Sequence, residues 1–177
     1  MMKRIDALKG KPLHICPILF IIPFFLRSLS EMRSMRQGLL FLLLAVGASL
    51  FTDIGAFLIG RSLGKRHPAP KISPNKTVAG CIGGLVSGTS VMLVLTMIFS
   101  ANTEIEVNYG ILIPCLIILS AVGQFGDLTM SAVKRRAGIK DFGNVLPGHG
   151  GFLDRFDSLI FTAPLLYVIV TFTNMIV

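Results

Sequence analysis

Apolar residues occur along this chain in long continuous runs. A run of about 20 apolar residues is long enough to cross a bilayer as an α-helix. Four runs approach or reach that length and a fifth, at the N-terminal end, is shorter: residues 38–60, 78–99, 110–133, 158–177 and 13–26. The pattern predicts an all-α integral membrane protein with about five transmembrane helices, of which the first is interrupted by Pro17 and Pro23.

The runs do not alternate between apolar and polar residues, which excludes the lipid-facing strands of a membrane barrel. Lipid offers no hydrogen bonds to the backbone, so a helix, which satisfies its own N–H and C=O groups, is the remaining solution. Composition agrees, with 53% hydrophobic residues, 15% charged residues and a mean hydropathy of +0.75. We expect one membrane domain over residues 1–177, with a basic tail and first span in 1–37 and the core in 38–177.

The distribution of Lys and Arg predicts the orientation. With five spans, the N-terminal tail and the segments 61–77 and 134–157 lie on one side of the membrane, and they hold 14 of the 17 positive charges. Short loops rich in Lys and Arg stay on the cytoplasmic side. We therefore expect a polar site at the cytoplasmic face of the inner, or cytoplasmic, membrane.

The formal net charge of +8 has two interpretations. It can reflect topology and attraction to anionic lipid headgroups, or an anionic substrate at the cytoplasmic face. Nucleic acid is not an expected partner, because the positive charges sit in short loops and no soluble module presents a basic surface.

Two carboxylates fall inside the apolar runs, Asp53 in LFTDIGAFLIG and Asp127 in AVGQFGDLTMSAVKR. An ionised group in a membrane is costly and usually faces a cavity, an ion or a charged partner. A structural ion pair with a nearby Lys or Arg is one explanation for each. We favour a functional site.

The residues around Asp127 sharpen this hypothesis. Asp127, Ser131 and Lys134 have the spacing i, i+4 and i+7, which places a carboxylate, a hydroxyl and an ammonium on one face of a helix. Asp154 and Asp157 follow in a glycine-rich segment just before the last run. Carboxylates that hold Mg²⁺ and cations that neutralise phosphate are what phosphoryl chemistry requires.

Glycines at 80, 84 and 88 have the small-xxx-small spacing in the third long run. This spacing favours close packing between helices, and a glycine-lined path for a nucleotide is the alternative. The stretch GAFLIGRS (55–62) is close to a P-loop pattern, but it lies inside a predicted span and does not follow a strand.

The segment SAVKRRAGIKDFGNVLPGHGGFLDRFDS, residues 131–158, resembles the signature of the phosphatidate cytidylyltransferase (CDP-diacylglycerol synthase) family, S-x-x-K-R-x(4)-K-D-x-G/S-x-x-L-P-G-H-G-G-x-x-D-R-x-D. Every specified position is filled. A second block, TDIGAFLIGRSLGKRHPAPKISPNKTVAGCIGG (52–84), resembles the family's D-x-x-A-Y-x-x-G-R-x-x-G-K … P-x-I-S-P-K-K-T-W-E-G-x-x-G-G. It departs from that pattern at Phe57, Asn75, Val78 and Ala79.

The resemblance, over about residues 40–177, implies an enzyme that condenses CTP with phosphatidic acid to give CDP-diacylglycerol and pyrophosphate. It further implies a homodimer among membrane lipids, with Mg²⁺ and possibly a monovalent cation such as K⁺. The implied metal ligands are Asp127 and Asp154, and the implied catalytic residues are Asp127, Ser131, Lys134 and Asp154. The residues expected to bind substrate are Asp53, Arg61, Lys65, Ser73, Lys76, Thr77, Arg135, Lys140, His149, Gly150, Gly151, Arg155 and Asp157.

Three alternatives stay open. The chain resembles only the C-terminal half of the family, so it could be a shortened, non-catalytic relative that binds a nucleotide or phospholipid. It could be a CTP-dependent polyprenol kinase, which has a similar nucleotide-binding region but should lack the full 131–158 signature. A transporter that uses Asp53 and Asp127 as a relay is the third, although internal repeats and paired broken helices are not evident.

Overall fold

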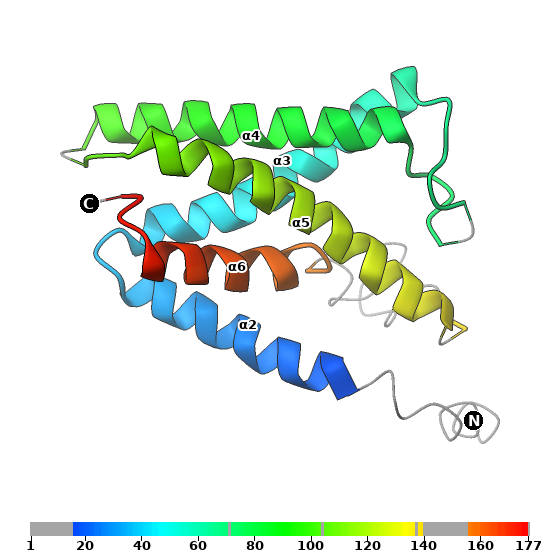
Figure 1. Ribbon diagram of the computed structural model, residues 1–177, viewed down its shortest axis with the longest axis horizontal. Coiled ribbons are helices and arrows are strands. Elements are labelled where there is room, and N and C mark those ends of the chain that lie inside the picture. The colour runs from blue at the N-terminus through cyan, green and yellow to red at the C-terminus, as the bar shows by residue number, and fades with distance from the viewer. Residues whose placement is uncertain (1–15, 71, 104, 137, 140–155, 177) are drawn as a thin grey trace, which may run out of the picture.

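The computed structural model describes residues 16–70, 72–103, 105–136, 138–139 and 156–176. In these ranges the chain forms five helices (Figure 1), namely α2 (Cys16–Ser34), α3 (Gly38–Leu63), α4 (Val78–Ala101), α5 (Tyr109–Arg136) and α6 (Leu159–Phe172). Among the described helices, α3, α4 and α5 are each long and apolar enough to cross a membrane. The predicted all-α membrane fold is confirmed.

The first and last helices differ from the lengths that the apolar runs predicted. Helix α2 continues past the short run as far as Ser34 and keeps Pro23 in its interior. Helix α6 has 14 residues and ends at Phe172, about 21 Å of helix at a rise of about 1.5 Å per residue. It is therefore shorter than a hydrocarbon core of about 30 Å.

A long-range contact explains the early end of α6. Thr173 has an extended backbone, and beyond it Ile176 forms an isolated antiparallel β-bridge with Val107. The N–H of Asn108 donates to the carbonyl of Met175 at 2.9 Å, and the Met175 side chain is buried. The end of the chain is thus attached to the segment between α4 and α5, and continuing the helix would break that contact.

The core lies where α2, α3, α5 and α6 meet. Each of these helices contributes large apolar side chains that are fully buried, namely Met32, Leu44, Leu112, Leu116, Leu119, Ile160 and Leu166. Helix α4 adds Met92 to this core. Large apolar side chains remain exposed on the outer faces of the helices, for example Ile82 and Val86 on α4. An apolar exterior is what a lipid-facing surface requires.

Helix α4 packs against α3 through its glycines. A Cβ added at Gly84 would lie 2.6 Å from the carbonyl oxygen of Thr52, and one at Gly80 would lie 2.6 Å from that of Ala56. Gly83 and Gly88 of α4 are buried as well. The glycines therefore let two helix backbones approach closely, as the packing interpretation of their spacing predicted.

Helix α6 is attached to the end of α5 by a buried ion pair. The Nζ of Lys134 lies 2.6 Å from Oδ2 of Asp157, and the two side chains are 10% and 5% exposed. Because Asp157 stands two residues before α6, the pair fixes the start of α6 beside the last turn of α5. It also joins the two described flanks of segment 140–155.

We predict that Gly84→Ala destabilises the protein by about 1–3 kcal/mol, since the new methyl group has no space against the α3 backbone. Thermal unfolding in detergent would measure the change. Ser90→Ala is the matched control, because Ser90 lies on the exposed side of the same helix. Equal stability of the two variants would contradict the close α3–α4 contact.

We also predict that Lys134→Met lowers the free energy of unfolding by about 3–5 kcal/mol, because it leaves a buried carboxylate without this ammonium. The double variant Lys134→Met/Asp157→Leu should recover much of the loss. The same double-mutant cycle on the exposed pair Arg27–Glu31, with 3.6 Å between Nε and Oε1, should give a coupling below about 1 kcal/mol. Strictly additive effects at Lys134 and Asp157 would disprove the coupling.

Candidate active site

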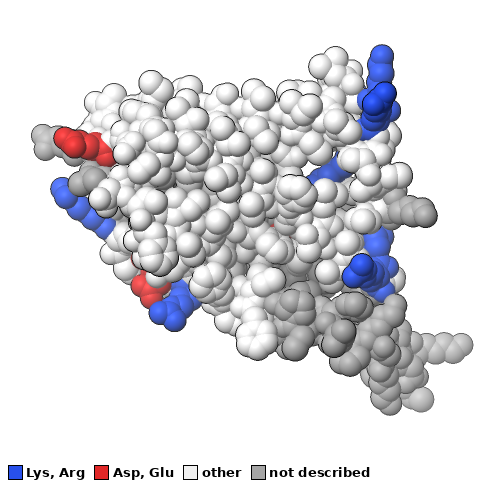
Figure 2. Space-filling model, in the orientation of Figure 1, with Lys and Arg blue, Asp and Glu red and all other residues white. Residues whose placement is uncertain are grey.

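Charged side chains gather at the two ends of the helices and leave an apolar belt between them (Figure 2). One end carries the segment between α3 and α4 and the last turn of α5. It holds most of the described cations, which are Arg61, Lys65, Arg66, Lys76, Lys134, Arg135 and Arg136. The carboxylates of interest lie toward the same end, where Asp127 is partly buried and Asp53 is exposed.

An ion pair between Lys76 and Asp127 is the centre of this polar region. The distance from Lys76 Nζ to Asp127 Oδ2 is 2.6 Å, with the side chains 18% and 31% exposed. The same ammonium donates to the backbone carbonyl of Gln124 at 3.1 Å. The Gln124 side chain in turn donates to the carbonyl of Cys81 at 3.0 Å, which ties this part of α5 to the first turn of α4.

Asp53 approaches the pair from α3. Ser158 Oγ donates to Asp53 Oδ2 at 3.3 Å, and Ser49 Oγ donates to Ser158 Oγ at 2.6 Å. Ser49 and Asp53 stand at i and i+4, so they share one face of α3. Asp53 also interacts electrostatically with both Asp127 and Lys76. Two carboxylates and one ammonium from separate segments therefore form one cluster.

The cluster is recessed below the ends of the helices that build it. Nine residues of α5 follow Asp127, and ten residues of α3 follow Asp53. At a rise of about 1.5 Å per residue, these lengths correspond to about 14 Å and about 15 Å of helix. Helix α4 begins beside the last turn of α3, where a Cβ at Gly60 would lie 2.9 Å from the hydroxyl of the N-cap Thr77. The Lys76 side chain extends from there to Asp127, which places a charged cluster among otherwise apolar helices.

The cluster has the chemistry to hold a divalent cation. Asp53, Asp127 and Lys76 together carry one net negative charge, and carboxylate and hydroxyl oxygens are the hard ligands that Mg²⁺ prefers. Among the described residues, no group of three or more His, Cys, Asp or Glu side chains lies close enough together to hold a metal ion without other ligands. Mg²⁺ is commonly held by only one or two carboxylates together with substrate phosphates, so Asp53 and Asp127 fit. The other predicted ligand, Asp154, lies outside the described residues.

The structure places other predicted residues around the cluster rather than within it. Thr77 is buried, and its hydroxyl accepts a hydrogen bond from the N–H of Gly80 at 3.1 Å, so it caps α4. The backbone carbonyl of Ser73 accepts a hydrogen bond from the N–H of Lys76 at 3.3 Å, so Ser73 is part of the turn that precedes α4. Arg61 and Lys65 are exposed at the end of α3. Their expected contacts with substrate stay predictions.

The predicted stripe on α5 is observed as a helical face. Asp127 lies in the cluster, Ser131 is partly buried, and Lys134 is paired with Asp157. Arg135 reaches across to the 61–77 segment, where its Nε donates to the carbonyl of Ile72 at 3.5 Å. Several other predicted residues lie outside the described residues, namely Lys140, His149, Gly150, Gly151, Asp154 and Arg155.

Three residues that surround the cluster through hydrogen bonds, Gln124, Ser49 and Ser158, were not predicted as site residues from the sequence. Gln124 could have been found, because it is a polar side chain within an apolar run and stands one turn before Asp127. Ser49 and Ser158 carry a weaker signal, since serine is common in membrane helices, where it often donates to its own backbone. Only the fold reveals that they converge on Asp53.

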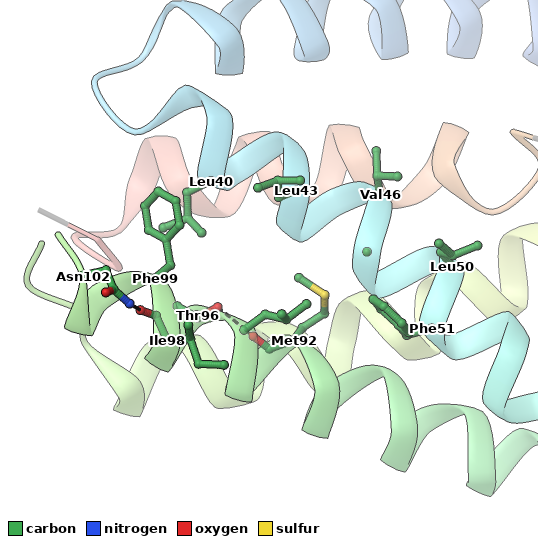
Figure 3. Close-up of a pocket in the computed structure, with 12 residues that line it drawn as sticks. Leu40, Leu43, Val46, Leu50, Phe51, Met92, Thr96, Ile98, Phe99 and Asn102 are labelled. Carbon is green, nitrogen blue, oxygen red and sulfur yellow. Dashed lines mark hydrogen bonds between the residues drawn. The ribbon is translucent and has the colours of Figure 1, made fainter.

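A separate hollow between α3 and α4 is apolar (Figure 3). It has a volume of about 480 Å³ and runs toward the end of the bundle opposite the cluster, lined mainly by Leu40, Leu43, Val46, Leu50, Met92, Leu95, Ile98 and Phe99. These side chains suit hydrocarbon and offer little to a triphosphate. The charged cluster is thus the better candidate for chemistry.

Comparison with known proteins identifies the family of the chain. Residues 9–173 match the model of the cytidylyltransferase family. The chain is 48% identical to the phosphatidate cytidylyltransferase of Bacillus subtilis (strain 168) over 77% of this chain and 50% of that protein. It is 48% identical to the phosphatidate cytidylyltransferase of Staphylococcus saprophyticus over 80% of this chain and 52% of that protein. It is 46% identical to the phosphatidate cytidylyltransferase of Staphylococcus aureus (strain COL) over 75% of this chain and 50% of that protein.

The chain spans about half the length of these curated relatives. The family match, in contrast, covers nearly all of the chain, including both segments that contribute Asp53, Lys76 and Asp127. The resemblance inferred from the two sequence blocks is confirmed. The chain belongs to the cytidylyltransferase family.

Proposed function

We propose that this membrane protein transfers the cytidylyl group of CTP to phosphatidic acid, giving CDP-diacylglycerol and pyrophosphate. The observation that carries the proposal is the meeting of Asp53, Lys76 and Asp127 in one recessed cluster. Asp53 and Lys76 come from the 52–84 block that resembles the family pattern, and Asp127 stands one helical turn before Ser131, where the other block begins. The names of the relatives supply the reaction.

The reaction requires two polyanions to approach each other. An oxygen of the phosphatidate phosphate forms a bond to the α-phosphorus of CTP, the bond from that phosphorus to the β-phosphate oxygen breaks, and pyrophosphate leaves with the electron pair. Catalysis of this kind consists mainly of alignment and charge neutralisation. Lys76, together with the predicted substrate-binding residues Arg61, Lys65 and Arg135, can supply the neutralisation.

Asp53 and Asp127 would hold Mg²⁺, with Asp154 as a further predicted ligand. The ion would supply positive charge to phosphate oxygens in the site. Ser158 and Gln124 would orient the site, since Ser158 donates to Asp53 and Gln124 fixes α5 against α4. A monovalent cation such as K⁺ stays a prediction from the family resemblance.

The position of the cluster suits a reaction between a lipid and a soluble nucleotide. We infer that the end with the 61–77 segment faces the cytoplasm, because short loops rich in Lys and Arg remain there. CTP would enter from that side, and the phosphatidate headgroup would reach the recessed carboxylates from the lipid. We further infer a homodimer, as the resemblance implies, which cross-linking in membranes would test.

The alternative to an active enzyme is a non-catalytic relative in the same family, which would bind CTP or a phospholipid without making product. Measuring CTP binding and turnover on the same preparation separates this function from the enzyme.

We predict that the purified chain converts phosphatidic acid and labelled CTP to labelled CDP-diacylglycerol when Mg²⁺ is present. Asp127→Asn should lower the rate by about 100-fold or more, the scale of losing one electrostatic contact to a transition state. EDTA should abolish the product, and added Mg²⁺ should restore it. Thin-layer chromatography of the labelled lipid would measure the product.

Glu31→Gln is the matched control, because it removes one carboxylate that pairs with Arg27 far from the cluster. Its activity should equal that of the original chain. Folded protein that binds CTP and makes no product would identify the non-catalytic relative. Full activity of folded Asp127→Asn would remove Asp127 from the site.

A further inference from the structure

Lys76 forms an ion pair with Asp127, the carboxylate to which the proposed function assigns Mg²⁺. Its ammonium lies 2.6 Å from Asp127 Oδ2 and interacts electrostatically with Asp53 as well. An ammonium and a divalent cation compete for the same carboxylate oxygens. The structure therefore contains an internal cation at the position where Mg²⁺ would bind.

The attachment of Lys76 allows its ammonium to move while its backbone stays fixed. Lys76 directly precedes Thr77, the N-cap of α4. The backbone carbonyl of Lys76 is hydrogen-bonded to Nδ1 of the His67 ring at 3.2 Å. Its N–H donates to the carbonyl of Ser73 at 3.3 Å. The side chain beyond this anchor has four methylene groups, so the charge can swing to another partner without a change in the fold.

The local charge balance favours such an exchange. Asp53, Asp127 and Lys76 have a net charge of one negative, so the carboxylates are incompletely neutralised by Lys76 alone. Phosphate oxygens attract an ammonium strongly, whereas an uncompensated carboxylate in a partly buried site is costly. If Lys76 turns to a phosphate, a second cation must replace it at Asp127.

We propose that Lys76 is an exchangeable counter-ion that pairs with Asp127 before nucleotide binds and moves to a phosphate of the incoming nucleotide. The proposal rests on the proposed function, which supplies the nucleotide. Lys76 then excludes divalent cations from Asp127 before the nucleotide arrives and favours their entry with it. Nucleotide and metal binding are coupled through one side chain, in a reciprocal manner.

A permanent structural ion pair makes a different prediction. If Lys76 stays on Asp127 permanently, its removal can free that carboxylate for a divalent cation but leaves CTP binding in EDTA unchanged, because the ammonium never contacts the nucleotide. If Lys76 is exchangeable, its removal strengthens the binding of a divalent cation in the absence of nucleotide and weakens the binding of nucleotide in the absence of metal. The two effects have opposite signs.

The experiment measures Mn²⁺ binding without nucleotide by electron paramagnetic resonance, and CTP binding in EDTA by calorimetry, in the detergent-purified full chain. Lys76→Met should bind Mn²⁺ about tenfold more tightly than the original chain, a difference of about 1.4 kcal/mol. It should bind CTP about tenfold more weakly, the scale of a lost charged hydrogen bond. Lys76→Arg keeps the charge and should not show the gain in Mn²⁺ affinity.

Arg66→Met is the matched control, because Arg66 is an exposed cation of the same segment outside the cluster. It should leave both affinities unchanged. The gain for Mn²⁺ should also disappear in Lys76→Met/Asp127→Asn, since the carboxylate that Lys76 releases is then absent. If Lys76→Met fails to fold, Lys76→Gln, which keeps a polar side chain, serves the same comparison.

Unchanged or weaker Mn²⁺ binding by folded Lys76→Met would overturn the exchange. Tighter Mn²⁺ binding by Arg66→Met of equal size would also overturn it, because the gain would then reflect general charge. Failure of the proposed function is distinguishable, since it would remove product from the original chain, with or without loss of CTP binding. In that case the Mn²⁺ comparison still decides whether Lys76 competes for Asp127.

Discussion

The close approach of α4 to α3 is the contact on which the polar site depends. Lipid provides no hydrophobic force that drives one apolar helix onto another, so van der Waals packing of small residues determines which helices meet. Gly80 and Gly84 bring the start of α4 against Thr52 and Ala56 of α3. Lys76 stands just before that start, and its distance from α5 follows from this packing.

The remaining polar contacts are consequences of placing charges among apolar helices. Each described carboxylate of the cluster has a partner from another segment: Asp127 has Lys76, and Asp53 has Ser158. Asp157 is paired with Lys134. An ionised group in this environment costs free energy unless it is paired. The pairs therefore reduce the cost of keeping charged groups among apolar helices.

The sequence predicted the parts of the structure that depend on local pattern. Apolar runs located the five helices, and the glycine spacing predicted the packing of α4. The i, i+4 and i+7 spacing placed Asp127, Ser131 and Lys134 on one helical face. Each of these predictions needs only the neighbouring residues in the chain.

The parts that could not be predicted depend on contacts between distant residues. The early end of α6 follows from the bridge between Val107 and Ile176, which no local pattern indicates. The pairing of Lys76 with Asp127, rather than with Asp53 alone, follows from how α4 and α5 pack. The sequence allowed an ion pair between Asp127 and a nearby Lys or Arg, and the structure shows that pair. That the partner is Lys76 could be seen only in the fold.

The ion pair between Lys134 and Asp157 has a consequence for how the bundle tolerates mutation. It holds the end of α5 beside the start of α6 independently of the residues that lie between them in the sequence. The entropy of closing a chain segment grows slowly with length, by about 0.6 kcal/mol for each doubling, so the contact between the two helices does not require a short connection. Substitutions in the connecting segment should therefore change the predicted substrate contacts more than the stability of the bundle.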